Sequence, residues 1–566
     1  MKVLLTAINA KYIHSNLAVY SLKAYAKEYQ KEIEIAEFTI NQRTEYILSE
    51  IYKRKPDVLC FSCYIWNIRF VLEVAEEFHK ICPKVPIWVG GPEVSYEVET
   101  FLKKNPYITG VMIGEGERIF QHLCECYVNQ REVEIRNIKG LAFLDTDGHM
   151  VCNEPEEPLD LSEIPFGYEN MEDFRNKIIY YESSRGCPFR CSYCLSSIDK
   201  KLRFRSLDLV KQELAFFIEK EVPQVKFVDR TFNCDHHHAM EIWRFIKEND
   251  RGITNFHFEI AADLLTDEEL AFLGTLRPGL VQLEIGVQTT NPQTIEEIHR
   301  SMDLTQLKSV VRRIKEKENI HQHLDLIAGL PFEDYETFQK SFDEIYALKP
   351  EQLQLGFLKV LKGSYMFEHK DEYRVVYESN PPYEVLETKW LPYDKVLCIK
   401  QVEEMLEVYY NSRQYPMCIK LLETEFESAY AMFEALGRYY EKNGYFGVSH
   451  SRIGRLEILL KFVETIDVSH LELFKQAATY DIYSRENAKS RPGFARNLSE
   501  FKQETRMFCK KGKLTHLEKF DYAMPQEETL NELPKRENKP YYLLFDYEKK
   551  DALNHRAGVS RVEVDV

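Results

Sequence analysis

Long apolar runs are missing from this sequence of 566 residues. No window approaches 18 consecutive apolar residues, so a membrane-spanning helix is not expected. The amino terminus, MKVLLTAINAKYIHSN, contains a short apolar run that ends at Asn9 without a small-residue cleavage site. We therefore expect a first strand there and not a secretory signal, which predicts a cytoplasmic protein with no membrane partner.

An excess of positive charge is missing as well. The chain has 74 Lys and Arg residues against 91 Asp and Glu residues, which gives a formal net charge of −17. This balance argues against a broad nucleic-acid-binding surface, although it is compatible with one local basic groove. Internal repeats and low-complexity tracts are absent, and the length predicts three or four globular domains.

The first 135 residues alternate short apolar runs with amphipathic helical patterns. The predicted strands are 2–8, 32–38, 58–64, 86–91 and 108–114. This alternation predicts an α/β fold with a doubly wound, five-stranded parallel sheet of the Rossmann type. Ligands of such sheets bind beyond the carboxyl ends of the strands, where this chain has NAKYIHSN, SCYIWN, GGPEVS and GEGE.

A second series of strands and helices covers residues 176–370. Its predicted strands are 178–184, 225–230, 256–262, 280–288, 322–330 and 352–361. Six βα units in a row predict a partial (β/α)6 barrel of the TIM type, with its chemistry at the carboxyl ends of the strands.

Two further segments complete the predicted organisation. Residues 136–175 are acidic and rich in proline and turn residues, which predicts a linker with a small hairpin around Asp147-Gly148. Residues 371–566 predict a mainly helical C-terminal domain with one late strand at 540–550.

Cysteine is plentiful, and three cysteines lie close together. Cys187, Cys191 and Cys194 have the spacing C-x3-C-x2-C in the stretch SSRGCPFRCSYCLSS, directly after a predicted barrel strand. Thiolates are ligands for iron–sulfur clusters and for zinc. A four-iron cluster held by three cysteines leaves one iron open to an exogenous ligand. The alternative is a zinc site with a remote fourth ligand, such as Cys234 or a histidine.

This cysteine motif on a barrel loop resembles that of the radical S-adenosylmethionine (SAM) superfamily. The resemblance implies a [4Fe-4S] cluster held by Cys187, Cys191 and Cys194, whose open iron binds the amino and carboxylate groups of SAM. Reduction of the cluster, by an electron donor such as flavodoxin or ferredoxin, would cleave SAM and form a 5′-deoxyadenosyl radical. By the same resemblance, Tyr193 lies near the adenine of SAM.

Three other strand ends resemble weaker motifs of that superfamily. The resemblance implies that Asp229, in FVDRTFN, contacts the amino group of SAM. It places Glu284 and Gln288, in LEIGVQTTNPQTI, toward the cofactor. In DLIAGLPFED, the segment from Ile327 to Pro331, with Gly329 at its centre, would pack against adenine. For any one of these segments alone, a buried strand capped by a turn is the alternative.

Two glycine-rich loops of the first sheet, VGGPEVS and IGEGE, resemble the cobalamin-binding domain that precedes the barrel in some radical SAM enzymes. Glycine allows close backbone approach to a bulky corrin and its nucleotide tail. The candidate cobalamin contacts are Ser62, Gly90, Gly91, Gly114, Glu115 and Gly116. We also expect at least one of Glu115 and Glu117 to cap the helix that follows.

The D-x-H-x-x-G motif, which supplies an axial histidine in many cobalamin proteins, is absent from the chain. The first loop has His14 without the partner aspartate or glycine. Most radical SAM relatives hold cobalamin without a histidine ligand, so we expect His14 to be a loop residue or a substrate contact. Tyr64 and Trp66 could cover the corrin, with core packing as the alternative.

The resemblance covers residues 1 to about 370 and implies methyl transfer from SAM, through cobalamin, to an unactivated carbon. The alternatives are a cyclase or rearrangement enzyme that uses cobalamin without methyl transfer, a tRNA methylthiotransferase, and a non-enzymatic cobalamin or redox sensor. The lack of a basic RNA-binding tail disfavours the methylthiotransferase, and the intact DLIAGLP disfavours the sensor. The sequence does not specify the substrate, for which a small molecule is the favoured class.

Overall fold

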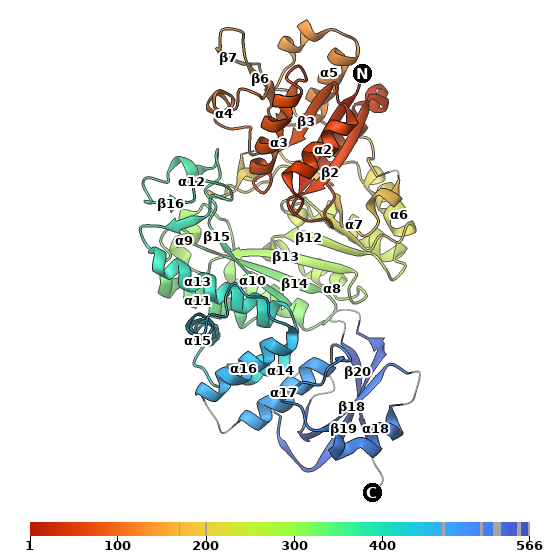
Figure 1. Ribbon diagram of the computed structural model, residues 1–566, viewed down its shortest axis with the longest axis vertical. Helices are drawn as coiled ribbons and strands as arrows, with labels where there is room; N and C mark the ends of the chain where they lie inside the picture. Colours follow the sequence, from red (N-terminus) through yellow and green to blue (C-terminus); the bar gives the residue numbers. More distant parts are fainter. Residues whose placement is uncertain are drawn as a thin grey trace.

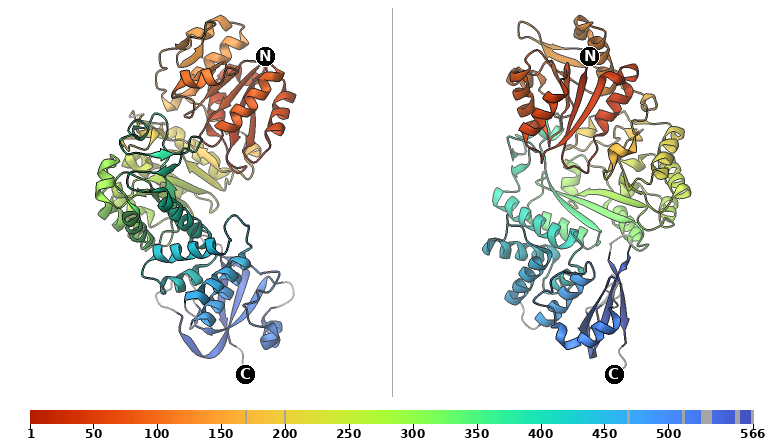
Figure 2. Two further views of the ribbon diagram at one scale, coloured as in Figure 1. Left: turned by 60° about the vertical axis from the view of Figure 1, so that its left-hand side comes forward. Right: turned by 45° about the vertical axis from the view of Figure 1, so that its right-hand side comes forward.

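The computed structural model describes residues 1–168, 170–198, 201–466, 470–509, 513–524, 534–551 and 556–563. Three parts follow one another along the long axis: the N-terminal sheet at one end, a second sheet in the middle, and helices with a small sheet at the other end (Figures 1 and 2). No helix within the described ranges is both long enough and apolar enough to cross a membrane.

The N-terminal part is built on a sheet with the strand order β2-β1-β3-β4-β5-β6-β7. Its parallel strands are β1 (Val3–Asn9), β2 (Ile33–Thr39), β3 (Val58–Ser62), β4 (Ile87–Gly90) and β5 (Gly110–Met112). The order 2-1-3-4-5 is that of a doubly wound, flavodoxin-like sheet. The predicted five-stranded parallel sheet is therefore confirmed.

Helices cover both faces of this sheet, as a doubly wound fold requires. They are α1 (Leu17–Tyr25), α2 (Thr44–Arg54), α3 (Ile68–Ile81), α4 (Val98–Lys104) and α5 (Gly116–Val128). Apolar residues of α2, α3 and α4 pack with one set of strand side chains, and those of α1 and α5 pack with the other set. The strands are therefore buried on both sides, which explains their continuous apolar runs.

A hairpin of β6 (Leu141–Leu144) and β7 (Met150–Cys152) extends the sheet in the antiparallel sense. Its turn is held by Asp145, whose carboxylate accepts bonds from the backbone N–H groups of Asp147 (2.9 Å) and His149 (2.8 Å). The hairpin expected near Asp147-Gly148 is thus present. It belongs to the sheet and not to a free linker, because the strand β6 covers the open edge of β5.

The middle part is a six-stranded parallel sheet with the order β15-β14-β13-β12-β11-β8, which confirms the predicted partial barrel. Its strands are β8 (Ile179–Tyr181), β11 (Gln224–Phe227), β12 (Asn255–Ile260), β13 (Val281–Gln288), β14 (His321–Ala328) and β15 (Gln352–Phe357). Its helices are α6 (Leu207–Glu219), α7 (His236–Asn249), α8 (Asp267–Leu273), α9 (Pro292–Glu297), α10 (Leu304–Lys315) and α11 (Tyr335–Tyr346). Buried and half-buried residues alternate along β13, so its polar side chains share the concave face.

The C-terminal part is mainly helical, as predicted, but it ends in a sheet. Its helices are α13 (Tyr393–Leu406), α14 (Pro416–Glu423), α15 (Ala429–Lys442), α16 (Arg452–Ile466), α17 (Leu471–Tyr483) and α18 (Lys502–Phe508). The predicted late strand lies within β19 (Arg536–Lys550), which pairs antiparallel with β18 (Thr515–Tyr522) and β20 (Ala557–Val562).

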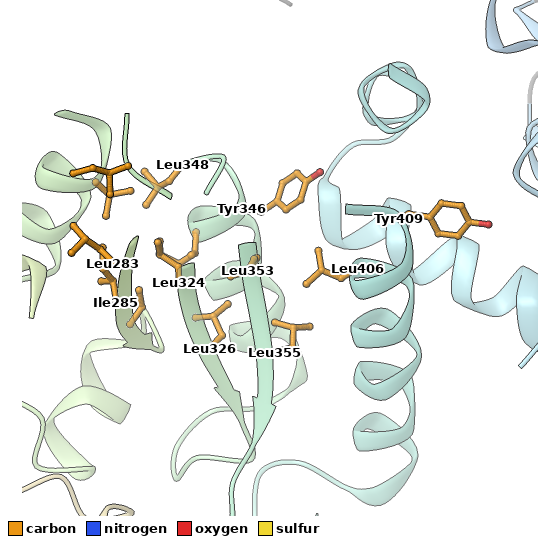
Figure 3. Close-up of a cluster of buried hydrophobic side chains, with 14 of the residues drawn as sticks. Leu283, Ile285, Leu324, Leu326, Tyr346, Leu348, Leu353, Leu355, Leu406 and Tyr409 are labelled. Atoms are coloured by element: carbon orange, nitrogen blue, oxygen red, sulfur yellow. The ribbon is translucent and has the colours of Figure 1, made fainter. Parts of the chain in front are cut away.

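The barrel and the C-terminal helices share one hydrophobic core. Figure 3 shows Leu355 of β15 and Leu406 of α13 in the space between the strand and the helix, while Tyr409, one turn further on, points away from β15. The edge of β15 is also covered by Asn411, whose amide accepts a bond from the Leu353 N–H (3.0 Å) and donates one to the Leu353 carbonyl (2.8 Å). The helices therefore close the open edge of the partial barrel.

Candidate active site

The cysteine loop leaves and re-enters the barrel through a short antiparallel pair, β9 (Ser184–Arg185) and β10 (Arg203–Phe204). Gly186 has a φ of +96°, and a Cβ there would lie 2.8 Å from the Lys201 carbonyl oxygen. Only glycine fits this position without strain, so Gly186 fixes the point where the loop begins.

The three thiols of the loop line one cavity at the carboxyl end of the barrel. Cys187 and Cys191 are buried and Cys194 is half-buried, and all three are free of disulfides. The cavity encloses about 850 Å³, including space open to solvent. Cys234, the fourth thiol considered for a zinc site, is not among its lining residues.

Three more of the residues predicted from strand-end motifs line the same cavity: Tyr193, Glu284 and Gln288. Gln288 has a φ of +74°, and its buried amide oxygen has no hydrogen-bond partner within the described part of the chain. A buried acceptor in this state is available to a ligand.

Asp229, Ile327 and Gly329 are not among the residues that line the cavity. The Asp229 carboxylate accepts bonds from the Ser183 N–H (2.9 Å) and from the hydroxyls of Ser183 (2.6 Å) and Ser184 (2.7 Å). Burial raises the pKa of Asp229 to about 6. Asp229 thus anchors the strand that carries the cysteine loop.

Gly329 is confined by the C-terminal part of the chain. Its φ is +88°, and a Cβ there would lie 2.7 Å from Cγ1 of Val385. The glycine is therefore explained by close packing against Val385, independently of any contact with adenine.

Glu284 is the centre of a charged network inside the barrel. Its carboxylate lies 2.9 Å from the Lys226 ammonium and 2.8 Å from Nε2 of His257. Burial acts to raise the pKa of Glu284, but these two partners hold it well below its ordinary range. Glu284, His323 and Asp325 bring possible metal-ligand atoms within 4.8 Å of one another. The Lys226 ammonium already neutralises the Glu284 carboxylate, so these three residues need no metal ion to balance the charge of Glu284.

Arg300 is a cavity residue that sequence reasoning missed. Its Nη1 lies 3.7 Å from Sγ of Cys191 and donates to the Tyr193 hydroxyl (3.2 Å), while its Nη2 donates to the Gly286 carbonyl. The buried Nε has no hydrogen-bond partner among the described residues. The sequence could have indicated Arg300 only by its place just beyond α9, the helix that follows the Gln288 segment.

Glu259 and Arg230 also line the cavity and were missed. Burial raises the pKa of Glu259 to about 7, although the charge of Arg230 opposes that shift. The signal for Glu259 was its place in FHFEI, where alternation puts it on the concave face together with His257.

In the glycine-rich loops of the N-terminal sheet, Gly91 and Gly114 have different surroundings. Gly91 has a φ of +120°, and a Cβ there would overlap the Cys63 carbonyl oxygen. Gly114 has a φ of +90°, and a Cβ there would meet nothing within 4 Å. Gly114 therefore borders open space that a ligand could use. Ser62, at the end of β3, is buried, and its hydroxyl accepts a bond from the Asn16 amide (3.3 Å).

Two other candidate glycines pack against neighbouring side chains. A Cβ at Gly90 would lie 3.3 Å from Cβ of Met112, and a Cβ at Gly116 would lie 3.0 Å from Cδ2 of Leu22. Close packing therefore favours glycine at both positions.

The prediction that Glu115 or Glu117 caps α5 is wrong. Glu115 occupies the N-cap position without a side-chain capping bond. Its carboxylate pairs with Arg203 and lies 3.4 Å from Arg185, while Glu117 pairs with Arg185 at 2.8 Å. Arg185 and Arg203 stand at the two ends of the cysteine loop, so these ion pairs tie that loop to the N-terminal sheet.

His14, in the loop after β1, and Tyr64 and Trp66, in the loop after β3, are the residues considered for contact with the corrin. Nδ1 of His14 lies 2.7 Å from the Tyr180 hydroxyl, and burial lowers the pKa of His14. The rings of Tyr64 and Trp66 stack with centroids 4.4 Å apart and planes 6° from parallel. Trp66 is 41% exposed, so it is not a core residue and presents an aromatic face at the strand end.

Comparison with protein families divides the chain into three matched segments. Residues 3–124 match the B12 binding domain, and residues 181–345 match the radical SAM superfamily. Residues 371–545 match a protein family of unknown function.

Curated relatives match slightly more than half of the chain. An uncharacterized methyltransferase of Pyrococcus horikoshii is 26% identical over 330 residues, which are 56% of this chain and 70% of the relative. The cobalamin-dependent radical SAM methyltransferase TokK of Streptomyces tokunonensis is 25% identical over 55% of this chain and 48% of its own length. An anaerobic magnesium-protoporphyrin IX monomethyl ester cyclase of Rubrivivax gelatinosus is 23% identical over 53% of this chain and 55% of its own length. The matches thus span about half of the latter two relatives.

Solved structures share the fold over more of the chain. The cobalamin-dependent radical SAM enzyme OxsB with aqua-cobalamin bound has a TM-score of 0.58 at 15% identity, over 85% of this chain and 80% of that one. The radical SAM methyltransferase TsrM of Kitasatospora setae, with cobalamin and a [4Fe-4S] cluster bound, has a TM-score of 0.53 at 17% identity, over 68% of this chain and 79% of that one. The chain thus carries a B12-binding domain at residues 3–124 ahead of a radical SAM domain at residues 181–345, and solved cobalamin-dependent radical SAM enzymes share its fold.

Proposed function

We propose that the chain is a cobalamin-dependent radical SAM enzyme that transfers a methyl group from SAM to an unactivated carbon. The observation that carries the proposal is one cavity, at the carboxyl end of a partial barrel, lined by the free thiols of Cys187, Cys191 and Cys194. The ion pairs of Glu115 and Glu117 join this cysteine loop to the B12-binding domain. Methyltransferases among the relatives favour methyl transfer over other radical reactions.

The cavity fits the cluster and SAM. When bound, the [4Fe-4S] cluster supplies the electron that cleaves SAM, and cobalamin carries the methyl group. The three thiols would hold three irons. Glu259 and Arg300 bring opposite charges into the cavity, which suits the sulfonium and the carboxylate of SAM, and the unpartnered Gln288 oxygen offers a further acceptor.

The N-terminal loops fit cobalamin. The open space beside Gly114 would admit the cofactor, and the stacked Tyr64 and Trp66 would offer an aromatic face to the corrin. We keep His14 as a loop residue bonded to Tyr180 and not as an axial ligand.

We propose four segments for the chain: residues 1–135, 136–175, 176–370 and 371–566. The pairing of β6 with β5 argues for moving the first boundary beyond residue 152. We place the enzyme in the cytoplasm, where free thiols stay reduced, with a small-molecule substrate and a flavodoxin or ferredoxin as electron donor.

A second candidate is ring closure or rearrangement without methyl transfer, and a tRNA methylthiotransferase is a weaker one. The cyclase relative of Rubrivivax gelatinosus favours the second candidate. The same cluster and SAM cavity would serve it, so the fate of the methyl group separates the two reactions.

The cluster assignment is tested by anaerobic reconstitution with iron and sulfide. We expect about four irons per wild-type chain. The triple variant Cys187→Ala/Cys191→Ala/Cys194→Ala should lose them, because thiolates supply the protein ligands. The matched control is Cys234→Ala, which removes a thiol outside the cavity lining and should retain the iron. Full iron content in the triple variant would refute the assignment, and equal metal loss in Cys234→Ala would favour a four-ligand zinc site.

A further inference from the structure

A short hairpin at the start of the C-terminal region lies between the two cofactor-binding parts. It consists of β16 (Val376–Tyr377) and β17 (Val385–Glu387). Figure 1 shows β16 and the nearby α12 (Tyr365–Glu368) between the N-terminal sheet and the barrel. The hairpin belongs to the segment that matches a family of unknown function, to which no role is assigned.

The hairpin is held by the barrel. The Val385 N–H donates to the Leu358 carbonyl (2.8 Å), and the Val360 N–H donates to the Tyr383 carbonyl (3.0 Å). Both partners lie just beyond β15. Val385 also packs against Gly329, at the end of the GLP segment after β14. The barrel therefore fixes the backbone on which Tyr383 stands.

Tyr383 reaches from this hairpin to the glycine loop after β4. Its hydroxyl donates a hydrogen bond to the carboxylate of Glu93, two residues beyond Gly91. Tyr383 is only 7% exposed, and the Lys362 ammonium lies 5.5 Å from the centre of its ring. A phenol bonded to a carboxylate in buried surroundings is a charge-assisted bond, stronger than a neutral one.

A second contact fixes the same loop. The ring of Tyr96 lies so close to Gly363 that a Cβ at Gly363 would overlap it. Gly363 has a φ of +82° and follows β15, so this contact joins the glycine loop to the barrel segment just beyond its last strand. The loop from Gly90 to Tyr96 is thus held at two points by residues outside its own domain.

Loop ordering affects ligand binding directly. A glycine-containing loop loses conformational freedom when it closes on a ligand, and a loop that is already held loses less. We propose that the β16–β17 hairpin, through the Tyr383–Glu93 bond, holds the Gly90–Gly91 loop in the conformation that binds cobalamin. Tyr383 is a positioning residue in this scheme, and the inference rests on the proposed binding of cobalamin to the N-terminal sheet.

The test is the affinity of the full-length protein, with its cluster reconstituted, for hydroxocobalamin, measured by spectrophotometric titration. Tyr383→Phe keeps the ring and removes the bond to Glu93, so we expect affinity to fall about tenfold, the effect of losing one charge-assisted bond. Glu93→Gln leaves an acceptor oxygen for Tyr383 and should lose less. If Tyr383→Phe does not fold, Glu93→Ala provides the test, because it removes the acceptor of the same bond and should lower the affinity to a similar extent.

The matched control is Tyr373→Phe. Tyr373 lies in the same segment, is equally buried, and donates to a glutamate, Glu297, at 2.6 Å. Glu297 stands on the barrel helix α9 and not on the glycine loop, so this variant should bind cobalamin as tightly as the wild type. Wild-type affinity for cobalamin in Tyr383→Phe, or an equal loss of affinity in Tyr373→Phe, would overturn this inference and leave the proposed function standing. Failure of the wild type to bind cobalamin would overturn the proposed function and the inference with it.

Discussion

Glu259 is the cavity residue whose charge is most sensitive to pH near neutrality. Burial raises its pKa from an ordinary value of 4.5 to about 7. Ionisation therefore costs stability as the pH rises from about 4.5 to 7, because the unfolded chain gives up this proton more readily than the folded one. A cationic ligand beside Glu259 would favour the ionised form and offset that cost.

This shift predicts a pH-dependent affinity for SAM. In the reconstituted protein, SAM should bind about tenfold more tightly as the pH rises from 6 to 8, because ionised Glu259 attracts the sulfonium of SAM, whose charge does not depend on pH. Glu259→Gln should bind about tenfold more weakly at pH 8 and lose this dependence. Isothermal titration calorimetry across this pH range measures both effects.

Glu333→Gln is the control for that titration. Burial raises the pKa of Glu333 to about 7 as well, but its carboxylate is bonded to the hydroxyls of Thr289 (2.5 Å) and Ser341 (3.0 Å) and does not line the cavity. The pH dependence should survive in this variant. Its survival in Glu259→Gln would assign the dependence to another group.

At the scale of single residues, a sequence motif identifies some residues of the candidate site and not others. The cysteines follow from their spacing, and Gln288 from a strand-end motif. Asp229 was expected to contact SAM, yet its carboxylate turns toward Ser183 and Ser184, because a strand-end position does not fix the direction of a side chain in the turn that follows. Arg300 could not be placed without the barrel, since its distance from Cys191 along the chain is more than a hundred residues.

At the scale of elements, the junction between the cysteine loop and α5 depends on buried ion pairs. Arg185 joins Glu117 at 2.8 Å and Glu182 at 2.7 Å, and the Glu117 side chain is only 7% exposed. Removal of one partner would leave a buried carboxylate without compensation, at a cost of about 3 kcal/mol.

The predicted outcome for Arg185→Met is a lower urea midpoint for unfolding, together with reduced iron after reconstitution, because the start of the cysteine loop loses its support. Arg131→Met is the matched control, since Arg131 pairs with Glu125 while both side chains are well exposed. An exposed pair contributes little to stability, so that midpoint should hardly move. Equal shifts in the two variants would contradict a special role for the Arg185 pairs.

Strands were predictable where both faces are buried. β1 and β3 read as continuous apolar runs, so their sequences identify them. The strand β7 carries half-buried and exposed residues, and β19 begins with the polar tract RENK, so neither pattern separates them from loops.

At the scale of the whole molecule, the C-terminal region is part of the enzyme's framework and not a detached appendage. Its helices share a core with β15, and its hairpin meets the glycine loop of the N-terminal sheet (Figures 1 and 3). The sequence predicts a mainly helical C-terminal domain correctly. It could not predict these contacts, because the residues that make them, such as Tyr383 and Asn411, stand in segments without a motif.

Methyl transfer requires two uses of SAM: the cobalamin site would take its methyl group, and the cluster site would cleave it to 5′-deoxyadenosine. Both can be tested without the substrate. The protein, reconstituted with iron, sulfide and hydroxocobalamin, would be reduced under anaerobic conditions and incubated with SAM that carries a deuterated S-methyl group. Mass spectrometry would then follow 5′-deoxyadenosine and the label. We predict 5′-deoxyadenosine together with deuterium in the corrinoid fraction, and no 5′-deoxyadenosine from the triple cysteine variant. Formation of 5′-deoxyadenosine without label in the corrinoid would contradict methyl transfer and favour rearrangement, and the absence of both products would contradict the account as a whole.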